Sequence, residues 1–172
     1  MMLECDMASD QTIYLVSCVG KKRADAAQAK DLYASEWFYR ARAFVEHSRC
    51  PWFILSAKFG LVTPEQTISP YEQTLNDMSR TERQAWAQRV QQQMDRVLPA
   101  CDRCVVLAGQ RYREFLMDYL TQRYTTEVPM KGLAIGKQLR WLGHPVSENK
   151  SLISGETPAS WSREERRGDD RG

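Results

Sequence analysis

Three short segments of the chain carry side chains that could do chemistry, and each directly follows an apolar run. The first segment includes Ser17, Cys18, Gly20 and Lys21. Its glycine allows close backbone approach, and free N–H groups beside a lysine suit a phosphate or a carboxylate. The spacing GxxxxGK[ST] of a nucleotide-binding P-loop is absent. The segment is therefore either an anion-binding turn or an ordinary turn with solvated lysines.

The second segment places Lys58 at the end of the apolar run 52–57, ahead of Tyr71 and Glu72 in the long stretch 61–78. A tyrosine ring can stack on a base, a carboxylate can orient water, and a lysine can bind a phosphate. This combination suits nucleobase chemistry. The alternative is that Tyr71 only pins the loop and that Glu72 is a solvated carboxylate.

The third segment, Gln110 to Arg113, follows the apolar run 104–108. A carboxamide can pair with a base edge, Tyr112 can stack on the base, and Arg111 or Arg113 can hold a phosphate. The alternative is a helix N-terminal turn whose tyrosine packs on the core.

Alternating strands and helices are predicted to position these segments. A capping box, Ser79 to Glu82, marks the start of the clearest helix. Stretch 61–78 is predicted to be an irregular loop of the site. The predicted strands are 12–18, 52–57, 104–108 and 125–128. The predicted helices cover 31–48 and 79–98, a segment after Gly109-Gln110 that carries Phe115, Leu116, Tyr119 and Leu120, and a last helical pattern with Leu139, Trp141 and Leu142.

This order of elements predicts a three-layer α/β/α domain with a mostly parallel central sheet. Ligands of such sheets bind beyond the carboxyl ends of the strands, where the three segments and residues 131–137 would meet. Each of these segments carries at least one cation. We therefore expect a positive edge around the site, although the whole chain is nearly neutral.

Size and composition favour one domain, residues 1–145, followed by a polar tail, 146–172, that is predicted to be disordered. Lys and Arg number 24 against 22 Asp and Glu, which gives a net charge of +2. Net charge alone therefore does not argue for nucleic acid. The N-terminus has no secretory signal pattern and no stretch is apolar enough to span a membrane, so a cytoplasmic protein is predicted.

The five cysteines are an odd number and are predicted to be thiols. His47 with Cys50, and Cys101 with Cys104, could together supply four zinc ligands. A single CxxC spacing is weak evidence, and Cys104 begins an apolar strand, so we expect neither a metal nor a cofactor. A Cys18 nucleophile paired with a histidine is also disfavoured, because the other histidine, His144, lies just before the polar tail.

A resemblance adds to this interpretation. The series LVSCVGKK, KDLYASEWFYRARAF, WFILSAKFGLV, SPYEQTL, ERQAWA, LAGQRYREFL and GLAIGKQLRWL resembles a widespread, uncharacterised domain of bacteria and phages. The resemblance covers Ile13 to about Leu142. More distantly, the strand followed by Cys-x-x-Lys-Lys is similar to the domain of archaeosine synthases and to the YaaA peroxide-stress family. Through the former it is similar to the uracil-DNA glycosylase-like fold.

The resemblance implies an enzyme that flips a modified base out of DNA and cleaves its N-glycosidic bond. Phage DNA with modified bases would be its substrate, and DNA its expected partner, with no obligate protein partner. Asp31 and Glu72 are then the expected catalytic carboxylates, assisted by Lys58. The expected substrate-binding residues are Ser17, Cys18, Gly20, Lys21, Tyr33, Tyr71, Gln110 and Tyr112.

One departure from the related families concerns Phe59, which stands where they have a histidine. The change removes one general acid/base, so electrostatic stabilisation would carry more of the catalysis. Two other functions remain open. One is an enzyme that modifies a 7-deazaguanine or nucleotide base, and the other is a non-catalytic DNA-binding protein like YaaA.

Overall fold

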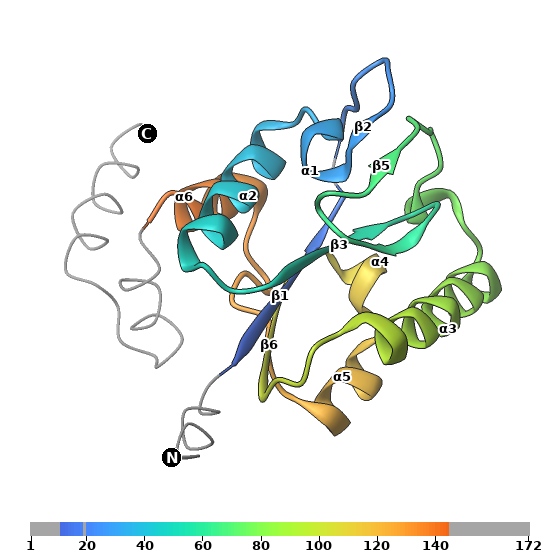
Figure 1. Ribbon diagram of the computed structural model, residues 1–172, viewed down its shortest axis with the longest axis vertical. Coiled ribbons are helices and arrows are strands. Elements are labelled where there is room, and N and C mark those ends of the chain that lie inside the picture. Colours follow the sequence, from blue (N-terminus) through green and yellow to red (C-terminus); the bar gives the residue numbers. More distant parts are fainter. Residues whose placement is uncertain (1–10, 19, 145–172) are drawn as a thin grey trace, which may run out of the picture.

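The computed structural model describes residues 11–18 and 20–144, and its centre is a five-stranded sheet of order β4-β3-β1-β6-β7 (Figure 1). Neighbouring strands among β3, β1, β6 and β7 pair in parallel, whereas β4 is antiparallel to β3. The predicted mostly parallel α/β sheet is therefore confirmed. The strands are β1 (Thr12–Ser17), β3 (Trp52–Ser56), β4 (Gly60–Val62), β6 (Arg103–Leu107) and β7 (Thr125–Glu127).

The central strands are apolar along their length because helices cover both faces of the sheet. Helices α2 (Glu36–Ser48) and α6 (Ile135–Leu142) lie on one side, and α3 (Arg80–Val97) and α5 (Met117–Arg123) lie on the other (Figure 1). Every residue of β3 is buried. On the α2 side, Phe44 packs edge-on against Tyr14 of β1, with 6.1 Å between ring centroids.

The path of the chain through the sheet creates a switch point beside β1. From β1 the chain passes through α1 (Ala29–Leu32) and α2 to β3 on one side, then through α3 to β6 on the other side of β1. The connections that leave β1 and β6 therefore diverge at the carboxyl ends of these neighbouring strands. Such a point leaves a crevice in which ligands of open α/β sheets bind.

Helix α3 begins at the predicted capping box, which is confirmed. The Ser79 hydroxyl accepts a hydrogen bond from the Glu82 backbone N–H at 3.2 Å, and the Glu82 carboxylate accepts one from the Ser79 backbone N–H at 2.6 Å. These two bonds satisfy N–H groups that have no partner inside the helix. Trp86 and Val90 belong to the buried stripe of this helix, which ends before Pro99.

Two predicted helices are interrupted. The expected helix 31–48 divides into α1 and α2, because Ser35 adopts an extended conformation and caps α2 by accepting from the Phe38 N–H at 3.2 Å. The backbone of Tyr33 pairs instead with that of Lys22. The helix expected after Gly109 likewise divides into α4 (Gln110–Arg113) and α5, since Leu116 N–H bonds to the carbonyl three residues earlier.

The stretch 61–78 is more ordered than the sequence predicts. It contains the end of β4, then β5 (Thr67–Ile68), which pairs with β2 (Ala27–Gln28), and the short 3₁₀ helix η2 (Leu75–Asp77). Gly60 makes the reversal from β3 into β4 possible with a φ of +74°, and a Cβ atom there would lie 2.2 Å from Gln93 Oε1. The prediction of an irregular loop was wrong for these short elements, because strands of two or three residues leave no periodic signal, and it holds for the residues between them.

Strand β7 confirms the fourth predicted strand, and α6 extends the last predicted helix toward its N-terminus. The tail predicted to be disordered, 146–172, lies outside the described residues. Within the described ranges, no helix is both long and apolar enough to cross a bilayer.

Candidate functional site

A pocket of about 510 Å³ lies at the switch point, beyond the carboxyl ends of β1 and β6. The last residue of β1 and the residue after it supply its most buried part, and η2 and α4, which contact each other, supply the walls. We call Ser17 and Cys18 the floor, because both are buried. The lining residues are Ser17, Cys18, Gly20, Thr74, Asn76, Gly109, Gln110, Arg111, Tyr112 and Glu114.

The floor is uncharged and one of its polar groups is unsatisfied. The Ser17 hydroxyl is buried and has no hydrogen-bond partner within the described part of the chain. Cys18 Sγ shares a hydrogen bond with the Tyr112 hydroxyl at 3.1 Å. Burial, and secondly the neighbouring Cys18, raises the pKa of Tyr112, so this phenol stays protonated at neutral pH.

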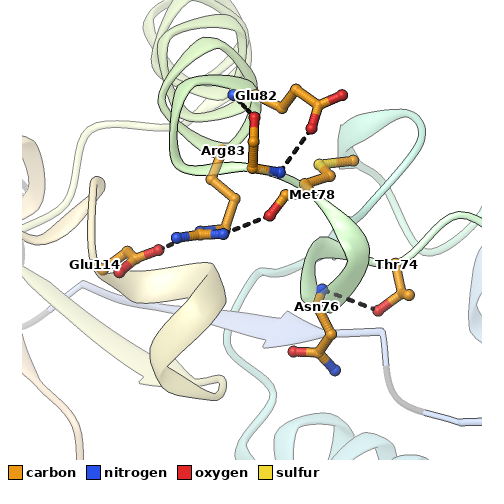
Figure 2. A network of polar contacts seen from close by, with 7 residues as sticks. Thr74, Asn76, Met78, Glu82, Arg83 and Glu114 are labelled. Atoms are coloured by element: carbon orange, nitrogen blue, oxygen red, sulfur yellow. Dashed lines mark hydrogen bonds and ion pairs between the residues drawn. The ribbon is translucent and has the colours of Figure 1, made fainter.

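A single arginine joins two walls of the pocket. Arg83 Nε donates to Glu114 Oε1 at 2.5 Å, and Arg83 Nη1 donates to the Met78 carbonyl at 2.5 Å (Figure 2). Among the residues described, Arg83 is the one charged side chain that is buried. It therefore ties the end of α4 to the segment between η2 and α3, and it fixes the orientation of the Glu114 carboxylate at the pocket.

The η2 wall is held by a local bond. The Thr74 hydroxyl accepts from the Asn76 backbone N–H at 3.3 Å, and the Asn76 carboxamide points away from this bond (Figure 2). Asn76 is exposed and lines the pocket. Its carboxamide therefore offers a donor and an acceptor to a ligand.

A second polar group, the tyrosine cluster of Tyr33, Tyr71 and Ser56, lies beyond the ends of β1 and β3. The two phenols share a hydrogen bond of 2.8 Å, and the Ser56 hydroxyl donates to the Tyr71 oxygen at 2.7 Å. Ser56 Oγ also accepts from the Phe59 backbone N–H at 3.1 Å. Burial is the main cause that raises the pKa of both phenols, so they remain neutral donors and acceptors.

The sequence model of a family described as "Family of unknown function (DUF6884)" matches residues 13–144. The chain belongs to this family. The match covers nearly the same residues as the resemblance noted in the sequence, and it includes every residue of the pocket. No curated protein matches the chain.

In this DUF6884 chain, the pocket brings together five of the predicted site residues. They are Ser17, Cys18, Gly20, Gln110 and Tyr112. Tyr33 and Tyr71 are instead buried in the tyrosine cluster. Lys21 is exposed next to Gly20, and its carbonyl accepts a hydrogen bond from the Ala34 N–H.

The three predicted catalytic residues do not line the pocket. Asp31 forms an ion pair of 2.6 Å with Arg42 of α2. Glu72 is exposed one residue beyond Tyr71, and the Lys58 ammonium lies 5.3 Å from the centroid of the Phe59 ring. The carboxylate that the fold places at the pocket is Glu114, which the sequence analysis did not select.

Sequence reasoning missed Thr74, Asn76 and Arg83 as well as Glu114. A signal for Glu114 was present, because it follows Gln110 by four residues and such residues share a helix face. Arg83 follows the capping-box glutamate directly, where an arginine is usually solvated. Its spacing nevertheless carries a signal, because Arg83 stands three residues before Trp86 and seven before Val90, on the apolar face of the predicted helix.

The cysteines outside the pocket do not form a metal site in the described ranges. No group of three or more His, Cys, Asp or Glu side chains gathers there, so His47, Cys50, Cys101 and Cys104 are not assembled as ligands. Cys104 lies in β6, and burial raises its pKa to about 12. Its thiol is therefore protonated and packs as a small apolar group.

Proposed function

We propose that the chain binds a nucleobase extruded from DNA and hydrolyses the N-glycosidic bond of a modified base, such as those of phage DNA. The observation that carries this proposal is Glu114, a carboxylate fixed by the buried Arg83 at a pocket with an uncharged floor. The neutral floor suits a heterocyclic base, and the carboxylate suits the sugar, where positive charge develops.

In the proposed reaction, water adds to C1′ of the sugar while the C1′–N bond breaks. The electron pair of that bond leaves with the base, which finally carries the proton that the water loses. Glu114 would stabilise the oxocarbenium-like sugar and orient the water. Because Arg83 already holds this carboxylate, little reorganisation is needed when the charge appears.

Other lining residues have roles in recognition. The Tyr112 ring can stack on the base, and the Gln110 carboxamide can pair with the base edge. Arg111 at the pocket and Lys21 beside Gly20 are exposed cations that can hold the flanking phosphates. These contacts would position the DNA backbone outside the pocket and the flipped base inside it.

The fold supports this assignment. A mostly parallel sheet with helices on both faces, and a pocket beyond its carboxyl edge, is compatible with the uracil-DNA glycosylase-like fold that the sequence resembles. Phe59 packs edge-on against Tyr71 at 5.6 Å, so this position contributes a core contact and no acid/base group. The proposed chemistry therefore relies on electrostatic stabilisation more than on protonation of the leaving base.

The test is incubation of the protein with phage DNAs of different base modification, with released bases and abasic sites measured by mass spectrometry. We expect the wild type to release a base, and Glu114→Gln to slow the single-turnover rate by about 10²-fold or more with DNA affinity retained. Asp31→Asn and Glu72→Gln are matched controls that should keep the wild-type rate. Absence of release from every modified DNA contradicts the proposal.

A second candidate is an enzyme that modifies a 7-deazaguanine or nucleotide base without releasing it. Cys18 at the pocket floor favours it, because its thiol, beside the Tyr112 hydroxyl, could add to a ring carbon that carries an amino group while the thiol proton passes to the ring nitrogen. Ammonia would then leave and water would displace the thiol, which is a hydrolytic change of the base. This function predicts a change in the mass of the nucleoside and no abasic site. It also predicts that Cys18→Ala abolishes the change, whereas the hydrolase should tolerate that substitution. A YaaA-like protein that only binds DNA would show neither product.

A further inference from the structure

The Ser17 hydroxyl is a polar group for which the protein itself provides no partner. Ser17 is 1 % exposed, its Oγ has no hydrogen bond within the described residues, and it lines the pocket. A buried hydroxyl without a partner is destabilising and is rare in native structures. A ligand atom at the floor would satisfy it.

The neighbouring strand shows that this fold can satisfy such a hydroxyl. Ser56 ends β3 as Ser17 ends β1, and the two strands are paired side by side. Ser56 is also fully buried, yet its Oγ both donates to Tyr71 and accepts from the Phe59 N–H. Of these two buried strand-end serines, the one that lines the pocket is the one whose hydroxyl has no partner in the described part of the chain.

The surroundings of Ser17 define the chemistry of its partner. Cys18 and Tyr112, its neighbours in the pocket, are linked to each other by a hydrogen bond, and the Tyr112 phenol is neutral at pH 7, with its pKa raised further by burial. The charged lining residues, Arg111 and Glu114, belong to α4 and the residue after it. An uncharged floor favours a neutral group over a phosphate or a carboxylate.

We propose that Ser17 hydrogen-bonds a polar edge atom of an uncharged heteroaromatic base at the pocket floor and thereby selects which bases are bound. The inference rests on the proposed function for the orientation of the nucleotide, with the base inward and the sugar beside Glu114. A site built to hydrogen-bond its ligand rejects analogues that lack the matching atom, because its buried polar group then stays unpaired.

This role gives Ser17→Ala opposite effects on stability and on binding. In the free protein the substitution removes an unsatisfied buried group, so the melting temperature should stay equal or rise. In the complex it leaves the polar atom of the base unpaired, so the affinity should fall. A hydroxyl with only a structural role would not separate the two quantities in this way.

The experiment uses the full chain and isothermal titration with deoxyadenosine, deoxyguanosine, deoxycytidine, thymidine, deoxyuridine and 7-deaza-deoxyguanosine. We expect the wild type to bind at least one of these nucleosides. Ser17→Ala should raise its Kd by about 5- to 100-fold without lowering the melting temperature. The matched control, Ser56→Ala, should lower the melting temperature and leave the Kd nearly unchanged, because Ser56 does not line the pocket.

An unchanged Kd in Ser17→Ala, a lowered melting temperature in that variant, or no binding of any nucleoside by the wild type overturns the inference. The outcome is separable from that of the proposed hydrolase. Nucleoside binding that depends on Ser17, without base release from any DNA, contradicts the proposed hydrolase activity and supports the proposed hydrogen bond between Ser17 and the base. Base release that is unaffected by Ser17→Ala supports the hydrolase activity and contradicts the proposed hydrogen bond between Ser17 and the base.

Discussion

The two junctions on either side of β1 differ in what fills them. Beyond β1 and β3, the tyrosine cluster closes the junction, and its hydroxyls are hydrogen-bonded to one another. Beyond β1 and β6 there is a pocket of about 510 Å³ with an unsatisfied serine at its floor. The position at a strand end is therefore not enough to make a binding site, because the protein can use the same position for its own core.

The connections of the chain explain this difference. Tyr33 lies in the break between α1 and α2, on the connection from β1 to β3, and it brings its phenol to meet Tyr71. The connections from β1 and β6 diverge at the switch point, so neither one covers the space between the two strands. Arg83 then holds the walls of that space from the side of α3.

The largest expected effect comes from Arg83→Met, which removes the guanidinium that links two walls of the pocket. The substitution leaves Glu114 and the Met78 carbonyl without their partner, and we expect it to reduce the free energy of unfolding by about 3 kcal/mol. This loss is at the low end of the range for removing one partner of a buried ion pair, because Glu114 is partly exposed. Urea unfolding measures the change.

The control for that prediction is Arg89→Met on the same helix. The Arg89 guanidinium is exposed and donates to the Lys58 carbonyl at 2.9 Å, away from the pocket lining. We expect a loss below about 1 kcal/mol. Equal losses for the two variants would show that the pocket walls do not depend on Arg83.

A smaller effect is expected from Tyr71→Phe, which changes the tyrosine cluster beyond β1 and β3. The change removes the hydroxyl that both Tyr33 and Ser56 contact, and it should lower the free energy of unfolding by about 1–3 kcal/mol. Nucleoside affinity should not change. A fall in affinity with unchanged stability would place the tyrosine cluster in the binding site.

The last effect is absent at neutral pH and is expected only at alkaline pH. Burial raises the pKa of Tyr33 and Tyr71, so their contribution to stability is complete below about pH 10, the ordinary value for tyrosine, and is lost as pH rises above it. In that range the unfolded tyrosines release protons while the folded ones retain them. Stability should therefore fall by about 1.4 kcal/mol per pH unit for each such tyrosine.

Tyr71→Phe tests this slope. The variant should lose stability less steeply than the wild type in urea unfolding between about pH 10 and pH 11, because one of the retained protons is gone. Tyr39→Phe is a suitable control, since Tyr39 is 57 % exposed. Identical slopes for the wild type and Tyr71→Phe would show that the Tyr71 phenol ionises in the folded protein as it does in the unfolded chain.

The fold was predictable from sequence where the pattern is long. Continuous apolar runs located the strands, and the capping box located the start of α3. Short elements were missed, because β4 and β5 depend on the turn at Gly60 and on partners distant in the chain. Single-residue caps such as Ser35 then divided helices that look continuous in the sequence.

The site was predictable where it follows a strand directly. Ser17, Cys18, Gln110 and Tyr112 come just after an apolar run or at its end, and they line the pocket. The choice of carboxylates was less predictable, because apart from the four-residue spacing of Gln110 and Glu114 it depends on pairing between separate elements. Arg42 binds Asp31, whereas Arg83 brings Glu114 into position.

The central place of β1 also affects the order in which this chain can fold during synthesis. β1 leaves the ribosome first, but its partner β6 ends only at Leu107, with Val16 aligned to that residue. Until β6 emerges, one edge of an apolar strand stays unpaired, and such edges can pair with other chains. We expect the nascent chain to need protection during this interval. The pocket between β1 and β6 can form only after it.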